Sequence, residues 1–309
     1  MSDKIIIEVR INEYATRDAN PHVPYSPAEI TAEALACARE GAAIIHYHAR
    51  DPVSGAPATD VALYADTARR IKAASDLIIM PTLGAWQLPS PQARIAHVVE
   101  MAGDAATKPE LAPIDMASSN VDVYDPRTKR FKTNDTVYVN TTATWQYLAE
   151  TMKAVGVKPM QALWNVSSVR CTAALTEMGV FSQPLYCGIV LTEHWLLAGH
   201  PGTVKGLEAF LDFLPAQQNW QWSVMCAGGN LFAVAAAAME RGGHIAIGLG
   251  DYPYPELGLP TNAELVARIT ALARAMGREV ATPAEAQLLL ELDCSRAERS
   301  NDTRVSSRS

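Results

Sequence analysis

The stretch AIIHYHARD, residues 43–51, places two histidines two positions apart at the end of an apolar, β-branched run. Runs of this kind predict buried β-strands, and residues that alternate along a strand share one face. His46 and His48 would therefore point the same way. The run belongs to a series that alternates with helix-patterned segments along nearly the whole chain, and that alternation decides the fold.

Eight such runs occur, separated by segments with helical spacing such as 28–40 and 261–277. The runs are IIIEVRI (5–11), AIIHYHA (43–49), LIIMPTL (77–83), LAPIDMA (111–117), KPMQALW (158–164), PLYCGIVL (184–191), WQWSVMC (220–226) and HIAIGLG (244–250). Eight strand–helix units in 309 residues predict an α/β protein built as a single (β/α)₈ TIM barrel. A doubly wound sheet is the main alternative, but no Gly-rich phosphate-binding turn follows the first run. We expect the barrel and a C-terminal helical extension over residues 1–292 and a polar tail over 293–309.

Several helix starts carry the signature of a capping box, in which a Ser or Thr and the Glu three residues later satisfy each other's backbone N–H groups. The pairs are Ser26 with Glu29, Thr261 with Glu264, and Thr282 with Glu285. A long polar insertion, 122–138, follows the expected fourth strand. In a barrel it would lie at the active-site end, as a lid or an oligomer contact.

The composition of the chain indicates which kinds of binding partner and compartment to expect. The net charge is −7, which disfavours a nucleic-acid partner because such partners require a basic face. The five cysteines form no CxxC pair, which indicates a reducing compartment. No stretch reaches the roughly 18 uninterrupted apolar residues of a transmembrane helix. We therefore expect a soluble, cytoplasmic protein without a membrane partner.

The C-terminal ends of barrel strands carry active sites, so the polar residues there are candidates. His46 and His48 close the second strand, Thr82 the third and Asp251 the eighth, whereas Ser118 and Asn120 follow the fourth. Two imidazoles at this spacing suit one metal ion, either zinc or iron, manganese or nickel, with a carboxylate as the usual third ligand. The alternative is that both are strand histidines satisfied by their neighbours.

The first strand carries charge where a barrel strand is normally apolar. Alternation places Glu8, Arg10 and Asn12 on the face opposite the apolar residues, and that face should point into the barrel. A buried carboxylate and guanidinium are costly unless they pair with each other or bind something. The pair is therefore either a structural ion pair or part of a site.

Three tryptophans, Trp86, Trp164 and Trp195, fall in expected loops at the pocket mouth. They indicate an apolar or aromatic-lined pocket, although each is also a common packing residue.

Five segments resemble those of a known family. They are NPHVPYSPAEI (20–30), EGAAIIHYHARDPVSGAP (40–57), KPELAPIDMASSN (108–120), GGHIAIGLGD (242–251) and GREVATPAEA (277–286). Together they resemble the β-keto acid cleavage enzymes, a family that includes 3-keto-5-aminohexanoate cleavage enzyme. The similarity runs in order along almost the whole chain.

The resemblance implies a (β/α)₈ barrel that is usually a homotetramer with one zinc ion per subunit. It implies an enzyme that reacts a β-keto acid with acetyl-CoA as co-substrate, yielding acetoacetate and an acyl-CoA by Claisen and retro-Claisen steps. His46 and His48 match the zinc histidines, Asp251 matches an acidic residue of proton transfer, and Thr82 stands where a substrate-contacting Ser is common.

The chain departs from the family pattern at several positions and resembles a divergent member. A glutamate that completes the zinc site is here Gly250, and a supporting arginine is Ala246. A common IGR segment reads AGG at 227–229, and Pro113 replaces a threonine.

The charged residues of the first strand offer a compensation for these departures. We expect Glu8 to supply the missing ligand and Arg10 the missing cation, with Glu13 as the alternative ligand. Candidates for substrate binding are Asn12, Glu13, Ser118 and Asn120. Alternative functions are another metal-assisted aldolase or hydrolase, or a catalytically impaired homologue that binds a metal or ligand.

Overall fold

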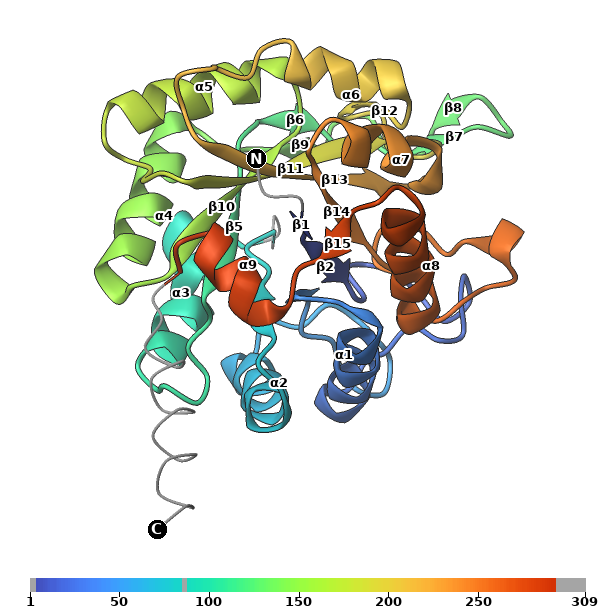
Figure 1. The fold of residues 1–309 in the computed structure, drawn as a ribbon, viewed down its shortest axis with the longest axis horizontal. Helices are drawn as coiled ribbons and strands as arrows, with labels where there is room; N and C mark the ends of the chain where they lie inside the picture. The colour runs from blue at the N-terminus through green and yellow to red at the C-terminus, as the bar shows by residue number, and fades with distance from the viewer. Residues whose placement is uncertain (1–3, 85–87, 293–309) are drawn as a thin grey trace.

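The computed structural model describes residues 4–84 and 88–292. Its centre is a sheet of eight parallel strands that curls into a (β/α)₈ barrel (Figure 1), which confirms the predicted fold. Around the barrel the strands run β4 (Ile78–Pro81), β3 (Ile44–Tyr47), β2 (Ile7–Arg10), β14 (His244–Ile247), β13 (Trp220–Ala227), β11 (Leu185–Thr192), β10 (Lys158–Leu163) and β5 (Leu111–Asp115). The circle closes where the backbone N–H of Glu110, just before β5, donates to the carbonyl oxygen of Ile79 in β4 at 3.2 Å.

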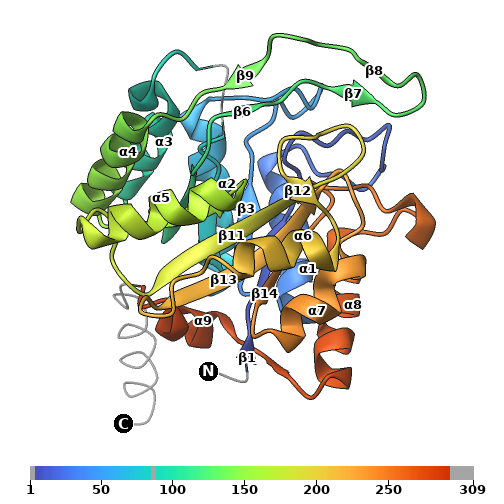
Figure 2. The ribbon, with the colours of Figure 1, turned by 90° about the horizontal axis from the view of Figure 1, so that it is seen from above.

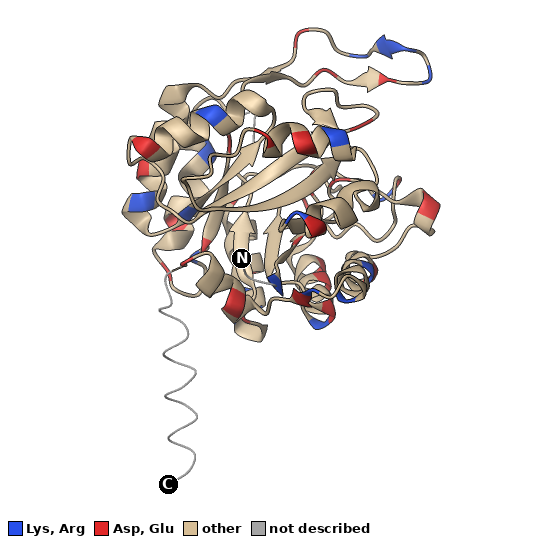
Figure 3. Ribbon diagram, turned by 45° about the horizontal axis from the view of Figure 1, so that its top comes forward, with Lys and Arg blue, Asp and Glu red and all other residues tan. Residues whose placement is uncertain are grey.

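A helix follows each barrel strand, and the helices form the outer layer of the molecule. They are α1 (Pro27–Glu40), α2 (Val61–Ala74), α3 (Pro91–Ala102), α4 (Thr142–Val155), α5 (Val166–Glu177), α6 (Val204–Leu211), α7 (Phe232–Glu240) and α8 (Asn262–Ala275). The capping boxes predicted for 26–29, 261–264 and 282–285 are confirmed at α1, α8 and α9 (Pro283–Leu289). Charged residues lie mostly on these helices and on the loops, whereas the barrel strands carry few (Figure 3).

The N-terminal end of the barrel is sealed by the predicted C-terminal extension. Helix α9 lies across this end, beside a short parallel pair formed by β1 (Lys4–Ile5) and β15 (Glu279–Val280) (Figure 1). Ala286 of this helix and Leu290, its C-cap residue, pack in one buried cluster with Ile6 and Leu111. The predicted tail 293–309 lies outside the described residues. With this end filled by apolar side chains, the cavity is left to the opposite end.

The polar insertion after β5 forms a ribbon of paired strands that extends beyond the barrel (Figure 2). Its antiparallel pairs are β6 (Ser119–Asn120) with β9 (Val137–Tyr138), and β7 (Tyr124–Asp125) with β8 (Arg130–Phe131). Val123 bridges to Leu196, in the loop between β11 and the short strand β12 (His200–Pro201). The ribbon therefore lies at the end of the barrel where active sites form, as predicted.

A short 3₁₀ helix, η1 (Pro255–Leu257), lies between β14 and α8. Among the described residues, no helix combines the length and the apolar character that crossing a membrane would require.

Candidate metal centre and active site

A cavity of about 640 Å³ lies at the C-terminal ends of the barrel strands. Its walls come from the strand ends, from the turn after β2 and from the ribbon. In a TIM barrel this end carries the active site. Most residues predicted to bind metal or to catalyse line it, namely Arg10, Glu13, His46, His48, Thr82 and Asp251.

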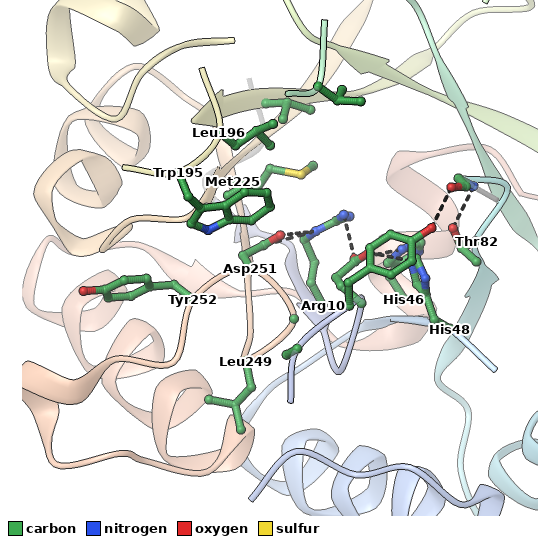
Figure 4. Close-up of a pocket in the computed structure, with 18 of the residues that line it drawn as sticks. Arg10, His46, His48, Thr82, Trp195, Leu196, Met225, Leu249, Asp251 and Tyr252 are labelled. Carbon is green, nitrogen blue, oxygen red and sulfur yellow. Dashed lines mark hydrogen bonds and ion pairs between the residues drawn. The ribbon is translucent and has the colours of Figure 1, made fainter. Parts of the chain in front are cut away.

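Three potential metal ligands meet in this cavity. The ligand atoms of Glu13, His46 and His48 lie within 4.8 Å of one another, and all three residues are buried. Oε1 of Glu13 lies 2.9 Å from Nε2 of His46, and its other oxygen faces Nε2 of His48. The two imidazoles lie side by side at the end of β3 (Figure 4), with ring centroids 5.3 Å apart. Their spacing in the sequence predicted this shared face.

The hydrogen bonding of His46 shows that the point where Glu13, His46 and His48 converge needs a cation. Its Nδ1 lies 3.0 Å from the carbonyl oxygen of Met80, which can only accept, so Nδ1 carries the hydrogen. In the neutral ring Nε2 then carries a lone pair and no hydrogen. It faces the carboxylate of Glu13, which is also an acceptor. Within the described residues, Oε1 of Glu13 and Nε2 of His48 have no aligned hydrogen bond. Buried lone pairs that converge in this way require a cation between them, either a proton or a metal ion.

The donor set fits a divalent metal ion of the zinc type. Two histidines and one carboxylate form a common catalytic zinc site, which keeps a further position for water or substrate. The carbonyl of Met80 supplies the outer hydrogen bond that orients a metal-binding imidazole and sets its tautomer.

The turn that carries Glu13 is held in place by Arg50. Glu13 has a φ of +32°, which is uncommon for a residue with a side chain. The Arg50 guanidinium donates to the carbonyl oxygens of Asn12, Glu13 and Ala15 at 3.2, 2.6 and 2.9 Å. The Asn12 side chain in turn exchanges hydrogen bonds with the backbone of His48, at 2.9 and 3.0 Å. These contacts lock the turn to the end of β3 and hold the Glu13 carboxylate toward the imidazoles.

Gly250 leaves the space that Glu13 occupies. Its N–H donates to the carbonyl oxygen of Arg10 at 3.0 Å, which ties the loop after β14 to the end of β2. A Cβ at this position would collide with the Cγ of Glu13 and lie 2.9 Å from the Arg10 carbonyl oxygen. The position where the sequence resemblance leads us to expect a glutamate is therefore bare, and the Glu13 side chain fills the space beside it.

Arg10 is surrounded by carboxylates. Its guanidinium lies 3.3 Å from Glu8, 2.6 Å from Glu13 and 3.1 Å from Asp251. Burial raises the pKa of Asp251 to about 6, against the opposing charge of Arg10. Burial also acts to raise the pKa of Glu13, but Arg10 and the two histidines outweigh it and hold that pKa well below its usual range. Glu13 is therefore an ionised carboxylate that can bind a metal ion, whereas the pKa of Asp251 lies close to neutral pH, where a carboxyl group can take up and release a proton.

The structure does not bring Glu8, which the sequence suggested as the third ligand, to the two histidines. In the sheet Glu8 pairs with Ile44, whereas Arg10 pairs with His46, so Glu8 lies one inward position deeper than the histidines. Its carboxylate accepts a hydrogen bond from the hydroxyl of Tyr186 at 2.8 Å and meets Arg10. Glu13, the alternative ligand, is the carboxylate that meets both imidazoles.

The residues predicted to bind substrate are mostly held elsewhere. Asn12 is fully buried and bonded to backbone, while Ser118 exchanges hydrogen bonds with the backbone of Asn140 at 2.8 and 3.1 Å. Asn120 is exposed in β6. None of these three lines the cavity. The side chains of Asn12 and Ser118 are bonded to backbone instead. Thr82 does line it, and its hydroxyl accepts from the N–H of Gly84 at 2.9 Å.

Two residues of the site had no role assigned from the sequence. Arg50 is one, although an arginine directly after two strand-end histidines was a usable signal, since a buried guanidinium needs several acceptors. Tyr14 is the other: its hydroxyl donates to the carbonyl of Gly84 at 2.9 Å, and its ring meets His48 edge to face at 5.1 Å. Tyr14 is partly exposed and covers the outer side of the cluster.

A second buried polar cluster lies across the cavity, where Asp115 ends β5. Its carboxylate accepts from the hydroxyl of Tyr138 at 2.6 Å and from the indole N–H of Trp164 at 2.7 Å. Arg94 lies behind Tyr138 and donates to its hydroxyl at 2.6 Å and to the side chain of Asn140 at 2.8 Å. Trp164 and Trp195 line the cavity as predicted, and Trp86 lies outside the described residues.

Comparison with known proteins places this arrangement in context. Residues 4–292 match the family described as beta-keto acid cleavage enzyme. The 3-keto-5-aminohexanoate cleavage enzyme of Acetoanaerobium sticklandii is 30% identical over 292 residues, covering 93% of this chain and 98% of that protein.

Two further relatives are named as acetyl-CoA-dependent transferases. The 3,5-dioxohexanoate:acetyl-CoA acetone transferase of Paraburkholderia graminis is 30% identical over 292 residues, with 90% of this chain and 92% of that protein covered. The 3-dehydrocarnitine:acetyl-CoA trimethylamine transferase of Rhizobium meliloti is 29% identical over 298 residues, with the same coverage. Among solved structures, the apo structure of ObcA superposes with a TM-score of 0.71 at 16% identity, over 88% of this chain and 66% of that one. At that identity the likeness supports the fold alone.

Proposed function

Because the chain belongs to the beta-keto acid cleavage enzyme family, we propose that it cleaves a β-keto acid with acetyl-CoA. The acyl groups are exchanged: R–CO–CH₂–COO⁻ and CH₃–CO–SCoA become acetoacetate and R–CO–SCoA. The observation that carries this proposal is the convergence of Glu13, His46 and His48 on one point in the cavity. Two relatives that are named for acetyl-CoA-dependent transfer support the choice of co-substrate. They are about as similar to this chain as the 3-keto-5-aminohexanoate cleavage enzyme is.

We propose that Glu13, His46 and His48 hold one zinc ion per subunit. When bound there, zinc would supply Lewis acidity toward the carboxylate and keto oxygens of a β-keto acid. Arg50 keeps the ligand turn rigid, and the hydrogen bond to Met80 keeps the Nε2 lone pair of His46 available.

Asp251 is the base in this proposal. Its Oδ1 accepts from Nε of Arg10 at 3.2 Å, whereas its Oδ2 is buried with no aligned hydrogen bond within the described residues. That oxygen can take a proton from C2 of the β-keto acid, and the resulting enolate attacks the thioester carbonyl carbon of acetyl-CoA and releases the CoA thiolate. The thiolate then attacks the keto carbon of the former β-keto acid, and the bond between C2 and that carbon breaks. R–CO–SCoA is released, and Asp251 returns its proton to C2, which completes acetoacetate. A pKa of about 6 leaves the carboxylate ionised at neutral pH, yet more basic than an exposed one. Arg10 orients the carboxylate of Asp251 and stabilises its negative charge whenever the carboxylate is ionised.

The direct test incubates the zinc-loaded protein with acetyl-CoA and a panel of β-keto acids with different substituents. We expect acetoacetate and a new CoA thioester in equal amounts, both quantified by liquid chromatography and mass spectrometry. Protein stripped of metal by a chelator is the control and should form neither product. Absence of both products from every acid, with zinc bound, would contradict the proposal.

We also propose that the enzyme is a cytoplasmic homotetramer that binds small molecules rather than nucleic acid, as the sequence predicts. Light scattering coupled to size exclusion measures the assembly directly, and a monomeric mass would contradict it. A different metal-assisted activity, or a homologue that has lost its chemistry, is not favoured by the comparisons.

A further inference from the structure

The cavity has an apolar floor inside the barrel. Four side chains from three neighbouring strands form it, and each is 5% exposed or less: Met160, Ala162, Val190 and Met225. Val121 and Val123 of the ribbon and Leu196 extend the same apolar wall toward the mouth. Figure 4 shows Met225 and Leu196 on the other side of the cavity from His46 and His48.

The positive charge of Arg10, which lines the cavity, is already neutralised by carboxylates. Within the described lining, Arg10 is the one Arg or Lys side chain. Its guanidinium meets the carboxylates of Glu8, Glu13 and Asp251. It therefore has no carboxylate-binding capacity to spare for an acidic group at the far end of a substrate.

The carboxylate of Asp115, which pairs with Ala162 of the floor in the sheet, has its hydrogen-bond partners as well. Each oxygen of Asp115 accepts a short hydrogen bond, one from Tyr138 and one from Trp164. The guanidinium of Arg94 lies directly behind, bonded to the same Tyr138 hydroxyl, and balances the charge of Asp115. An ammonium group on a substrate would therefore meet a carboxylate that already has its donors and its counter-ion.

The two reactants approach this space from different directions. The acetyl group of acetyl-CoA is attached to a carrier that contains a large, charged nucleotide. The acetyl group must therefore reach in from the open mouth of the cavity. The carboxylate and keto oxygens of the β-keto acid are directed to the cluster of Glu13, His46 and His48. The floor is the space left for the substituent beyond the keto group.

We propose that the substrate is a β-keto acid whose substituent beyond the keto group is uncharged and apolar, packed against Met160, Val190 and Met225. This inference rests on the proposed function and adds the substrate class. A charged substituent would lose its hydration on this floor without gaining a partner.

Met160 and Met225 limit the length of the substituent that the floor can hold. Gly188 of β11 lies between them, and a Cβ at this position would lie 2.8 Å from Cε of Met225 and 3.1 Å from Cε of Met160. The space left by the missing side chain is filled by thioether ends, which are flexible and repack easily.

The test compares three acids with the same six-carbon backbone whose substituent beyond the keto group is uncharged, cationic or anionic: 3-oxohexanoate, 5-amino-3-oxohexanoate and 3-oxohexanedioate. Formation of the CoA thioester gives kcat/KM for each acid. Calorimetric titration of the zinc-loaded protein without acetyl-CoA gives binding independently of turnover. We expect the uncharged acid to be favoured at least about tenfold in both measurements.

The outcomes separate this inference from the proposed function. Equal or better use of a charged acid would overturn the inference and leave the proposed function intact. Tighter binding of the uncharged acid without thioester formation would support the inference and contradict the proposed function. Failure of all three acids to bind would overturn the inference.

Two floor variants provide a second test. Met225→Ala deepens the floor and should raise the ratio of kcat/KM for 3-oxooctanoate over 3-oxohexanoate about tenfold, whereas Ala162→Leu should lower it by a similar factor. Zinc content measured on both variants verifies that the site has folded. An unchanged ratio in both, with zinc retained, would overturn the assignment of the floor.

Discussion

Two buried polar clusters face each other across the cavity, and they differ in how their atoms are satisfied. In the cluster of Arg94, Tyr138 and Asp115, donors and acceptors alternate, and each charged group has aligned partners. In the cluster of Glu13, His46 and His48, acceptors face acceptors, and buried atoms lack aligned hydrogen bonds. Both clusters are similarly buried. The difference lies in the direction of their lone pairs. It indicates that the first cluster stabilises the fold, whereas the second can hold a metal ion.

If this comparison is right, changes in the unsatisfied cluster should affect activity or metal binding, and changes in the satisfied cluster should affect stability. The largest effect is expected at Asp251, the proposed base, which Arg10 links to Glu13 of the unsatisfied cluster. Asp251→Asn keeps the shape and the contact with Arg10 but removes the proton acceptor, so kcat should fall about 10²–10⁴-fold. Zinc content by elemental analysis should stay at the wild-type level. A kcat within a factor of about three of wild type would show that Asp251 is not the base.

Arg94→Met should produce the opposite pattern. It leaves the hydroxyl of Tyr138 and the side chain of Asn140 without their buried donor, at a cost of about 2–4 kcal/mol in the free energy of unfolding. Urea unfolding measures that cost, and zinc per folded chain should be unchanged. Loss of zinc without loss of stability would break the distinction between the two clusters.

Gly250→Ala tests whether the bare position beside Glu13 is needed. The added methyl group would collide with the Glu13 side chain, so zinc affinity should fall about tenfold while the fold is retained. Gly103→Ala is the matched control, because its added Cβ meets only the carbonyl of Glu100, at 3.3 Å. Competition with a chelating dye gives both affinities, and equal values would mean that Glu13 tolerates a side chain at position 250.

The smallest effect is expected far from both clusters, at His244, where β14 begins. Its Nδ1 accepts from the N–H of Ile6 at 3.1 Å, and burial lowers its pKa from the ordinary 6.5 to about 3. The folded protein thus keeps a neutral ring while the unfolded chain takes up a proton below about pH 6.5, so stability is lost as the pH falls from 6.5 toward 3.

Between pH 6.5 and 5.5 the wild type should lose about 1 kcal/mol that His244→Gln does not lose, measured by urea unfolding at both pH values. Identical slopes for the two proteins would show that His244 titrates at its ordinary pKa. Activity should be unaffected by this difference, since the residue lies at the sealed end of the barrel.

The sequence predicted the barrel, the capping boxes and the strand-end residues, because periodicity and capping are local properties. His46, His48 and Asp251 follow from the rule that barrel strands present their C-terminal ends to the site. The choice between Glu8 and Glu13 was not accessible in this way. Alternation says that Glu8 points inward but not how deep it lies, and the depth is set by the register of Arg10 against His46.

The residues that position the ligands depend on contacts distant in sequence. Glu13 reaches the imidazoles only because Arg50 bonds the carbonyl groups of its turn and because Gly250 carries no side chain. Ser118 was predicted to bind substrate, but the insertion folded into a ribbon that uses its hydroxyl as a backbone partner. These outcomes follow from how separate loops pack, which no local pattern contains.

The most direct test of the central claim is the metal content of Glu13→Gln beside that of Glu8→Gln. Elemental analysis of freshly purified, folded protein should find about one zinc per chain in the wild type and in Glu8→Gln, and less than about a tenth of that in Glu13→Gln. Full zinc occupancy in Glu13→Gln, or its loss in Glu8→Gln alone, would contradict the assignment of Glu13 as the third ligand.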